Sequence, residues 1–137
     1  MAREVFLDTA YAIALSVMTD AHHAQALQLA EKLEASGARL VTTRAVLLEI
    51  GDALCKPRYR AAATALLTVL EQDAQVEIVE LSVALYQRGL HFYASRTDKE
   101  WGITDCLSFV LMHERNIQDA LTTDVHFQQA GFQALLR

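Results

Sequence analysis

Hydrophobic residues in this chain fall into short continuous runs, separated by longer segments whose apolar positions recur every three or four residues. A short apolar run bounded by polar or turn residues is typical of a strand that is buried on both faces. The runs predict strands at Val5 to Leu7, Arg39 to Thr43, Val76 to Leu81, Asp119 to Thr123 and Phe132 to Leu136. The first of these runs leads directly into an aspartate, Asp8.

The segments between the runs have the spacing of amphipathic helices. Asp20, Ser82 and Thr104 are suited to cap the start of a helix. Gly37 and Gly131 are suited to end one, because glycine readily adopts the left-handed backbone found there. The spacing predicts helices at Ala10 to Met18, Ala21 to Ala35, Arg44 to Leu54, Arg58 to Glu71, Ser82 to Ser95, Asp105 to Arg115 and Val125 to Ala130.

Strands and helices therefore alternate from one end of the chain to the other. This order predicts an α/β fold with a mostly parallel central sheet and right-handed crossover connections. A length of 137 residues suits one domain with a substantial core, and no linker or repeat divides the sequence. We expect a single domain over residues 1–137.

The composition argues against several other classes of protein. Hydrophobic residues make up 53% of the chain, which disfavours a disordered protein. The apolar runs end well before the ~18–20 residues that a membrane span needs, and the first residues lack the apolar core of a signal peptide. We expect a cytoplasmic protein that does not attach to a membrane. Cys55 and Cys106 lie in apolar helical patterns, so we expect both to be buried free thiols.

The net charge of −5 limits how the protein can bind nucleic acid. Binding by bulk electrostatics needs clustered lysine and arginine, and this chain is acidic overall. A protein that binds phosphate through metal cations remains compatible with this charge. Lys56, Arg58 and Arg60 form one local basic cluster, and Arg96 with Lys99 forms a weaker one.

Two aspartates directly follow predicted strands. Asp8 follows the first strand and Asp124 follows the fourth, and each has a threonine beside it. Open α/β sheets bind ligands beyond the carboxyl ends of their strands, and a threonine hydroxyl can orient a carboxylate or a water there. Taken singly, either aspartate could equally be a turn residue or a helix cap.

Two further carboxylates lie on predicted helices among apolar neighbours. Alanine and valine lie one turn from Glu49, and a carboxylate on such a face is costly unless it is paired or bound to metal. Asp52 is a weaker alternative one turn further on. Asp105 shares its face with Phe109 and Met112. A salt-bridged surface glutamate would explain Glu49, and the helix dipole alone would explain Asp105.

Four carboxylates at one rim repel one another and stay ionised only if cations compensate them. Ligands that are all oxygen suit Mg²⁺ or Mn²⁺, as one ion or two. Such ions activate water and neutralise phosphate, so the pattern indicates phosphodiester hydrolysis. His126 is the only histidine near this rim, and a lone histidine is more often structural. No nucleotide-binding glycine motif is present, so ATPase and dinucleotide functions lack support.

Four segments together resemble the PIN-domain family, and in particular its bacterial VapC-type toxins. They are FLDTAYAIAL near the start, the helix that carries Glu49 after a strand ending in TT, GITDCLSFVLMHERNI, and ALTTDVHFQQAGF. The likeness covers nearly the whole chain, and TDCLSF and TTDVHFQQAGF are its most specific parts. It implies a Mg²⁺- or Mn²⁺-dependent endoribonuclease on a small α/β/α sandwich.

The resemblance also assigns roles to residues. It places the acidic quartet of the family on Asp8, Glu49, Asp105 and Asp124, with Asp8 and Asp105 as the principal metal ligands. Thr9 and Thr104 would help to orient the site. Contacts with RNA would fall on Lys56, Arg58, Arg60, Arg96 and Lys99, whose alternative role is that of solvated surface charges.

The resemblance further implies a homodimer and an antitoxin protein that inserts a peptide into the active-site groove. Two other interpretations stay open. A non-catalytic PIN-like binding module would keep the fold and use the acidic rim to bind a basic segment of a protein. A receiver-like phospho-acceptor domain would need a lysine at the end of the last strand, where only Arg137 follows.

Overall fold

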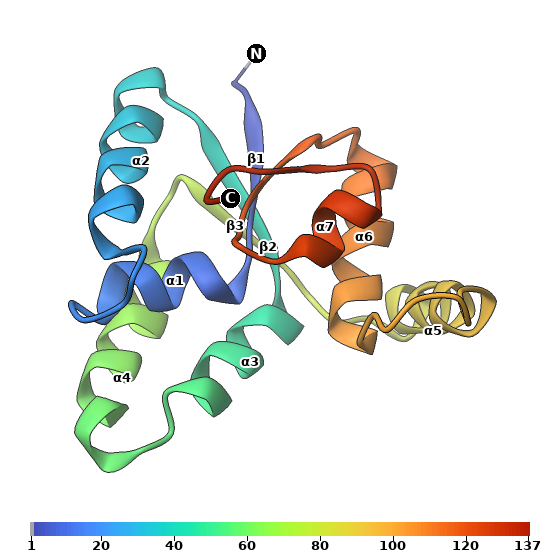
Figure 1. The fold of residues 1–137 in the computed structure, drawn as a ribbon, viewed down its shortest axis with the longest axis horizontal. Helices are drawn as coiled ribbons and strands as arrows, with labels where there is room; N and C mark the ends of the chain where they lie inside the picture. Colours follow the sequence, from blue (N-terminus) through green and yellow to red (C-terminus); the bar gives the residue numbers. More distant parts are fainter. Residues whose placement is uncertain (1) are drawn as a thin grey trace.

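A computed structural model describes residues 2–137 and contains a five-stranded sheet in which every pairing is parallel (Figure 1). The strands are β1 (Glu4–Leu7), β2 (Arg39–Thr43), β3 (Val76–Val79), β4 (Asp119–Leu121) and β5 (Gln133–Ala134). Their order across the sheet is β3-β2-β1-β4-β5. The chain therefore adds strands outward on one side of β1 and then returns to add the last two on the other side.

Seven helices connect these strands within residues 2–137. They are α1 (Thr9–Ser16), α2 (His23–Ser36), α3 (Arg44–Ala53), α4 (Pro57–Gln72), α5 (Val83–Ser95), α6 (Ile103–Arg115) and α7 (Val125–Gln129). Right-handed crossovers place α1 to α4 on one face of the sheet and α5 to α7 on the other, as Figure 1 shows. The predicted α/β sandwich is confirmed.

The core consists of the sheet and the apolar sides of the helices that cover it. Val5 and Phe6 are fully buried, as expected for a parallel strand covered on both faces. Phe109 on α6 and Phe127 on α7 meet edge to face at 4.9 Å between ring centroids. Phe127 also lies against Phe6, at 6.2 Å. This aromatic contact fixes α6 and α7 to the central strand.

Several element boundaries differ from the prediction by a few residues. The α2 helix begins at His23 rather than Ala21, because the Asp20 carboxylate accepts a hydrogen bond from the His22 N–H and forms a turn there. The α6 helix begins at Ile103 with Gly102 as its cap, so Thr104 lies inside the first turn and is not the cap. The α1 helix ends at Ser16, before extended backbone at Val17.

The two cysteines differ in their surroundings. Cys106 is a buried free thiol, as predicted, whereas the prediction for Cys55 is wrong because its side chain is exposed. The α3 helix ends at Ala53, so Cys55 lies in the turn before α4 and outside the apolar face. Within residues 2–137, every helix is too short or too polar to cross a bilayer.

Candidate active site

The order of the strands reverses between β1 and β4, which is the usual position of a ligand site in an open α/β sheet. Asp8 follows β1 and Asp124 lies three residues after the end of β4. Leu7 is in register with Leu121, so these neighbouring strands end at the same level. The topology therefore brings two carboxylates from opposite ends of the chain to one rim.

Asp8 is the most buried of the four carboxylates, with 6% of its surface exposed. The Thr122 hydroxyl donates a hydrogen bond to its Oδ2 atom at 2.7 Å. Burial raises the pKa of Asp8 to about 7; the Thr122 hydrogen bond opposes this rise, while the nearby charges of Glu49 and Asp105 add to it. A carboxyl group in this position is difficult to ionise unless a cation is close.

Glu49 reaches the same rim from α3. Thr43 ends β2 and caps α3, because its hydroxyl accepts a hydrogen bond from the Val46 N–H at 3.2 Å. The helix therefore starts at the carboxyl edge of the sheet and presents Glu49 there, partly exposed. The Thr9 hydroxyl donates a hydrogen bond to the Glu49 carboxylate. Thr9 thus links the first turn of α1 to Glu49.

Asp105 lies in the first turn of α6 and is partly buried. Its Oδ2 atom accepts a hydrogen bond from the Gly102 N–H at 3.2 Å. Burial raises the pKa of Asp105, and so does the charge of Asp124. One turn further on, Phe109 is fully buried and holds this face of α6 against the core. The same face therefore directs Asp105 toward the rim.

Asp124 caps α7 and lies beside a histidine. Its Oδ1 atom accepts a hydrogen bond from the His126 backbone N–H at 2.9 Å. The His126 Nδ1 atom lies 3.2 Å from Asp105 Oδ2 and 3.4 Å from Asp124 Oδ1. One ligand atom from each of Asp105, Asp124 and His126 falls within 4.8 Å of the others.

The residues at this rim fit a divalent cation. The four carboxylates interact electrostatically in a chain, from Glu49 to Asp8, from Asp8 to Asp105 and from Asp105 to Asp124. Carboxylates crowded and partly buried in this way need positive charge to remain ionised. Oxygen atoms from carboxylates are the ligands that hard divalent ions prefer.

Sequence reasoning missed two residues that contact the carboxylates. Thr122 is fully buried; its hydroxyl donates to Asp8 and accepts from the Asp124 N–H at 3.0 Å. The sequence places His126 near the rim but does not show that its ring contacts both Asp105 and Asp124. Thr104 lies with Glu49 along a groove, and its carbonyl accepts a hydrogen bond from Ser108.

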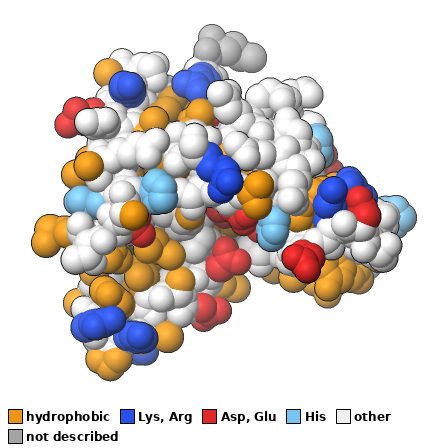
Figure 2. Space-filling model, viewed as in Figure 1, with side chains coloured by type: hydrophobic (Ala, Val, Ile, Leu, Met, Phe, Trp, Pro, Cys, Tyr) orange, Lys and Arg blue, Asp and Glu red, His pale blue; other side chains and the backbone are white. Residues whose placement is uncertain are grey.

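The five predicted RNA-contacting residues fall into two groups. Arg96 and Lys99 both pair with Asp98, an acidic residue of the same loop. None of the ion pairs within residues 2–137 involves Lys56, Arg58 or Arg60. Figure 2 shows basic side chains gathered at the lower left, where Figure 1 places the turn between α3 and α4, and acidic side chains near the middle of this face.

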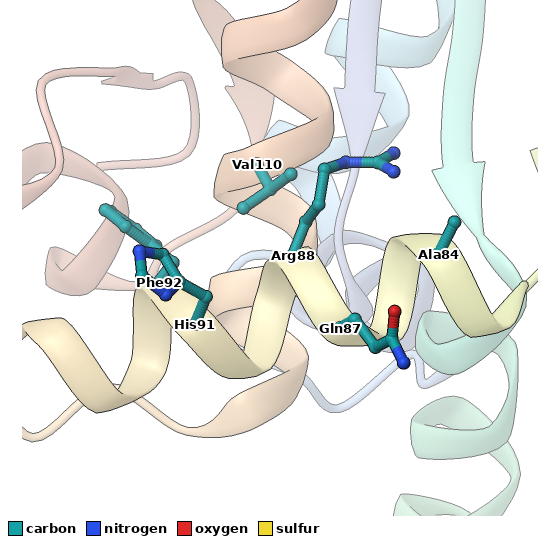
Figure 3. A pocket seen from close by; sticks show the side chains of 6 residues that line it. All are labelled: Ala84, Gln87, Arg88, His91, Phe92 and Val110. Atoms are coloured by element: carbon teal, nitrogen blue, oxygen red, sulfur yellow. The ribbon is translucent and has the colours of Figure 1, made fainter.

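Two hollows lie near α5, and only one adjoins the carboxylates. The larger, of about 550 Å³, is lined by α5 residues and by Val110 of α6, with no acidic side chain (Figure 3). Arg88 and His91 are among its lining residues, and the Arg88 guanidinium pairs with Glu114. The smaller, of about 290 Å³, lies between α3, α5 and α6 and includes Glu49 and Thr104 in its lining. The second hollow is therefore the groove that leads to the carboxylate rim.

The model of the PIN domain family matches residues 5–133 of this sequence. The chain belongs to the PIN domain family. It is similar to proteins from two strains of Mycobacterium tuberculosis, CDC 1551 / Oshkosh and ATCC 25618 / H37Rv, each named 23S rRNA-specific endonuclease VapC20. Identity to each is 28% over 130 residues, which cover 93% of this chain and 95% of the relative.

A solved PIN-domain structure has the same fold. The crystal structure of Mycobacterium tuberculosis VapC20, described as a Sarcin-Ricin loop cleaving toxin, matches with a TM-score of 0.81 and 26% sequence identity. The match covers 93% of this chain and 95% of that one. The predicted resemblance to the PIN-domain family is confirmed over nearly the whole chain.

Replacing Thr122 with valine tests how its hydroxyl supports the Asp8 carboxylate. We expect the free energy of unfolding to fall by roughly 1–3 kcal/mol, because valine can neither donate to Asp8 nor accept from the Asp124 N–H. Metal binding should weaken as well, since Asp8 loses the group that favours its ionised form. Urea denaturation and calorimetric titration with Mn²⁺ measure the two effects.

Thr42→Val is the matched control for this substitution. Thr42 is also fully buried, and its hydroxyl donates to the Leu7 carbonyl at 2.7 Å rather than to a carboxylate. The Thr42→Val variant should be less stable than the parent but should keep the parent's affinity for metal. Equal metal affinities for the two variants would show that Thr122 has no special role beside Asp8.

Proposed function

We propose that this single PIN domain, over residues 1–137, is an endoribonuclease that uses Mg²⁺ or Mn²⁺ to hydrolyse RNA phosphodiester bonds. We further propose that it is the toxin of a type II toxin–antitoxin pair. The observation that carries the proposal is the placement of the four carboxylates at the rim where the strand order reverses, with Asp105, Asp124 and His126 within 4.8 Å of one another. The endonuclease named above, similar over nearly its full length, supports the same activity.

Each residue at the rim has a proposed task. One or two divalent ions, when bound, would activate a water and neutralise charge on the scissile phosphate. Asp8 and Asp105 would be the principal ligands, with Asp124 and Glu49 completing the set. Thr122 holds the Asp8 carboxylate in place, and Thr9 holds that of Glu49.

The RNA strand would extend from the carboxylates toward the turn between α3 and α4. Lys56 lies in this turn, and Arg58 and Arg60 lie in the first turn of α4. None of the three makes an ion pair within residues 2–137, although the Arg60 guanidinium donates to the Cys55 carbonyl, so no carboxylate neutralises their charge before phosphate binds. Arg96 and Lys99 are the weaker candidates, because Asp98 already neutralises part of their charge.

The groove beside Glu49 is our proposed site for an antitoxin segment. Leu48, Leu81 and Tyr86 give it exposed apolar walls, and Glu49 with Asp52 makes one edge acidic. A segment with apolar and basic side chains would match both features. Along α5, an exposed apolar stripe continues through Val83, Tyr86, Leu90 and Tyr93 and would suit a second copy of the chain.

Mass measurement in solution tests both partner proposals. The chain alone should have the mass of a dimer, and co-expression with the protein encoded by the neighbouring reading frame should give a stable complex. A monomeric mass for the isolated chain would contradict the homodimer.

Removing metal tests the catalytic proposal. Purified protein should cleave RNA in the presence of Mg²⁺ or Mn²⁺, lose this activity in excess EDTA, and regain it when either ion is restored. Cleavage that persisted in EDTA would contradict the proposed chemistry. Absence of both cleavage and metal binding at millimolar concentrations would instead favour the non-catalytic binding module.

A further inference from the structure

We propose that the Nδ1 atom of His126 is itself a ligand of the divalent ion, together with Asp105 and Asp124. This end of the site would then be a mixed nitrogen and oxygen site that prefers Mn²⁺ to Mg²⁺. The inference rests on the proposed function for the presence of an ion, and goes beyond the four carboxylates by adding a ligand of different chemistry.

The position of His126 is fixed by its neighbours in the fold. Phe127, the next residue, is fully buried in the aromatic contact with Phe109 and Phe6. At the other end of α7, the Trp101 indole N–H donates a hydrogen bond to Gln129 Oε1 at 3.0 Å. These two contacts hold the helix after the histidine, and the Asp124 cap holds its start, so packed structure directs the imidazole toward the carboxylates.

The spacing of the three side chains suits one ion. Neighbouring ligands around an octahedral ion with bonds of about 2.1 Å lie about 3 Å apart. The Nδ1 atom lies 3.2 Å from Asp105 Oδ2 and 3.4 Å from Asp124 Oδ1, close to that separation. Asp105, Asp124 and His126 are each partly exposed, so an ion can reach them from solvent.

The chemistry of imidazole indicates which ion this end of the site prefers. Mg²⁺ strongly favours oxygen ligands, whereas imidazole nitrogen binds transition-metal ions well. Asp8 and Glu49 offer only oxygen at their end of the rim. A nitrogen ligand at the Asp105 and Asp124 end would raise the affinity for Mn²⁺ there without a matching gain for Mg²⁺.

A purely structural role for the same histidine makes a different prediction. His126 could donate its Nδ1–H to Asp105 and only hold that carboxylate in place. Asparagine can replace this function, because its side-chain amide presents a donor at a similar distance from the backbone. His126→Asn therefore distinguishes the two roles. It keeps a donor for Asp105 but offers the ion only a hard oxygen in place of the imidazole nitrogen.

The experiment uses the full chain with Mn²⁺ or Mg²⁺ as the only added ligand. Pulsed electron paramagnetic resonance of the Mn²⁺-loaded protein should show coupling to an imidazole nitrogen, and His126→Asn should lose it. Calorimetry should show Mn²⁺ affinity falling about tenfold in His126→Asn, with a smaller change for Mg²⁺. His91→Asn is the matched control, since His91 is exposed on α5 beside the other hollow (Figure 3); it should change neither readout.

The outcomes distinguish this inference from the proposed function. Mn²⁺ bound without nitrogen coupling, or an unchanged ratio of Mn²⁺ to Mg²⁺ affinity in His126→Asn, would overturn the inference and leave the nuclease proposal standing. Failure of the parent protein to bind either ion would overturn both. The coupling measurement on the parent protein needs no variant, so the test holds even if His126→Asn folds poorly.

Discussion

Replacing Asp8 with asparagine is expected to lower RNA cleavage by about 10²–10³-fold while the chain remains folded. A bound metal contributes several kcal/mol of transition-state stabilisation, and each ~1.4 kcal/mol corresponds to a tenfold change in rate. Asparagine has the same shape and can keep the contact with Thr122. It carries no charge, however, so the proposed principal ligand is lost. Single-turnover cleavage of a labelled RNA measures the effect.

Asp73→Asn is the matched control for this loss of charge. Asp73 is exposed after α4, and its carboxylate accepts a hydrogen bond from the Gln75 N–H that an asparagine oxygen can also accept. Cleavage by this variant should equal that of the parent. If Asp8→Asn also cut RNA as fast as the parent, the assignment of the active site would be wrong.

The stability of the metal-free protein should fall as the pH rises from about 4 to about 7. Asp8 has a pKa of about 7 in the folded protein and an ordinary value of 3.8, so the folded state binds this proton more tightly than the unfolded chain. Below pH 4 the group is neutral in both states and costs nothing. Above pH 7 it is ionised in both states, and burial of the charge costs up to about 4 kcal/mol.

Urea denaturation in EDTA at pH 5 and pH 8, on the parent and on Asp8→Asn, isolates this contribution. Asp8→Asn should have a higher free energy of unfolding than the parent, and this difference should be larger at pH 8 than at pH 5. Addition of Mg²⁺ or Mn²⁺ at pH 8 should restore stability to the parent, because an ion that binds only the folded state stabilises it. An equal difference in unfolding free energy at both pH values would show that burying the ionised Asp8 carboxylate does not destabilise the fold.

The fold could be predicted from the sequence because its signals are local. Short apolar runs, helical spacing and glycine or proline boundaries each depend on a few neighbouring residues, and they gave the correct order of strands and helices. Where two local signals competed, the prediction failed by a few residues. Thr104 is a good cap in isolation, but Gly102 caps α6 because Asp105 accepts its N–H.

The contacts of the site depend on distant pairings that no local pattern contains. Asp8 and Thr122 are 114 positions apart, and only the register of β1 on β4 brings them together. Had that register been known, the hydroxyl could have been found, because Leu7 pairs with Leu121 and the next residues are Asp8 and Thr122. The position of His126 likewise depends on where Phe127 packs.

The position of β4 beside β1 also sets when the protein can become active during its synthesis. The ribosome releases the chain from its amino end, so β1, α1 and α3, with Asp8, Thr9 and Glu49, emerge first. Thr122, Asp124 and His126 emerge only after β4, and until β4 emerges β1 has no partner on that side. A nascent chain that has not yet exposed β4 therefore carries Asp8, Glu49 and Asp105 without Asp124. On the proposed function, the chain cannot cleave RNA until β4 and α7 have left the ribosome.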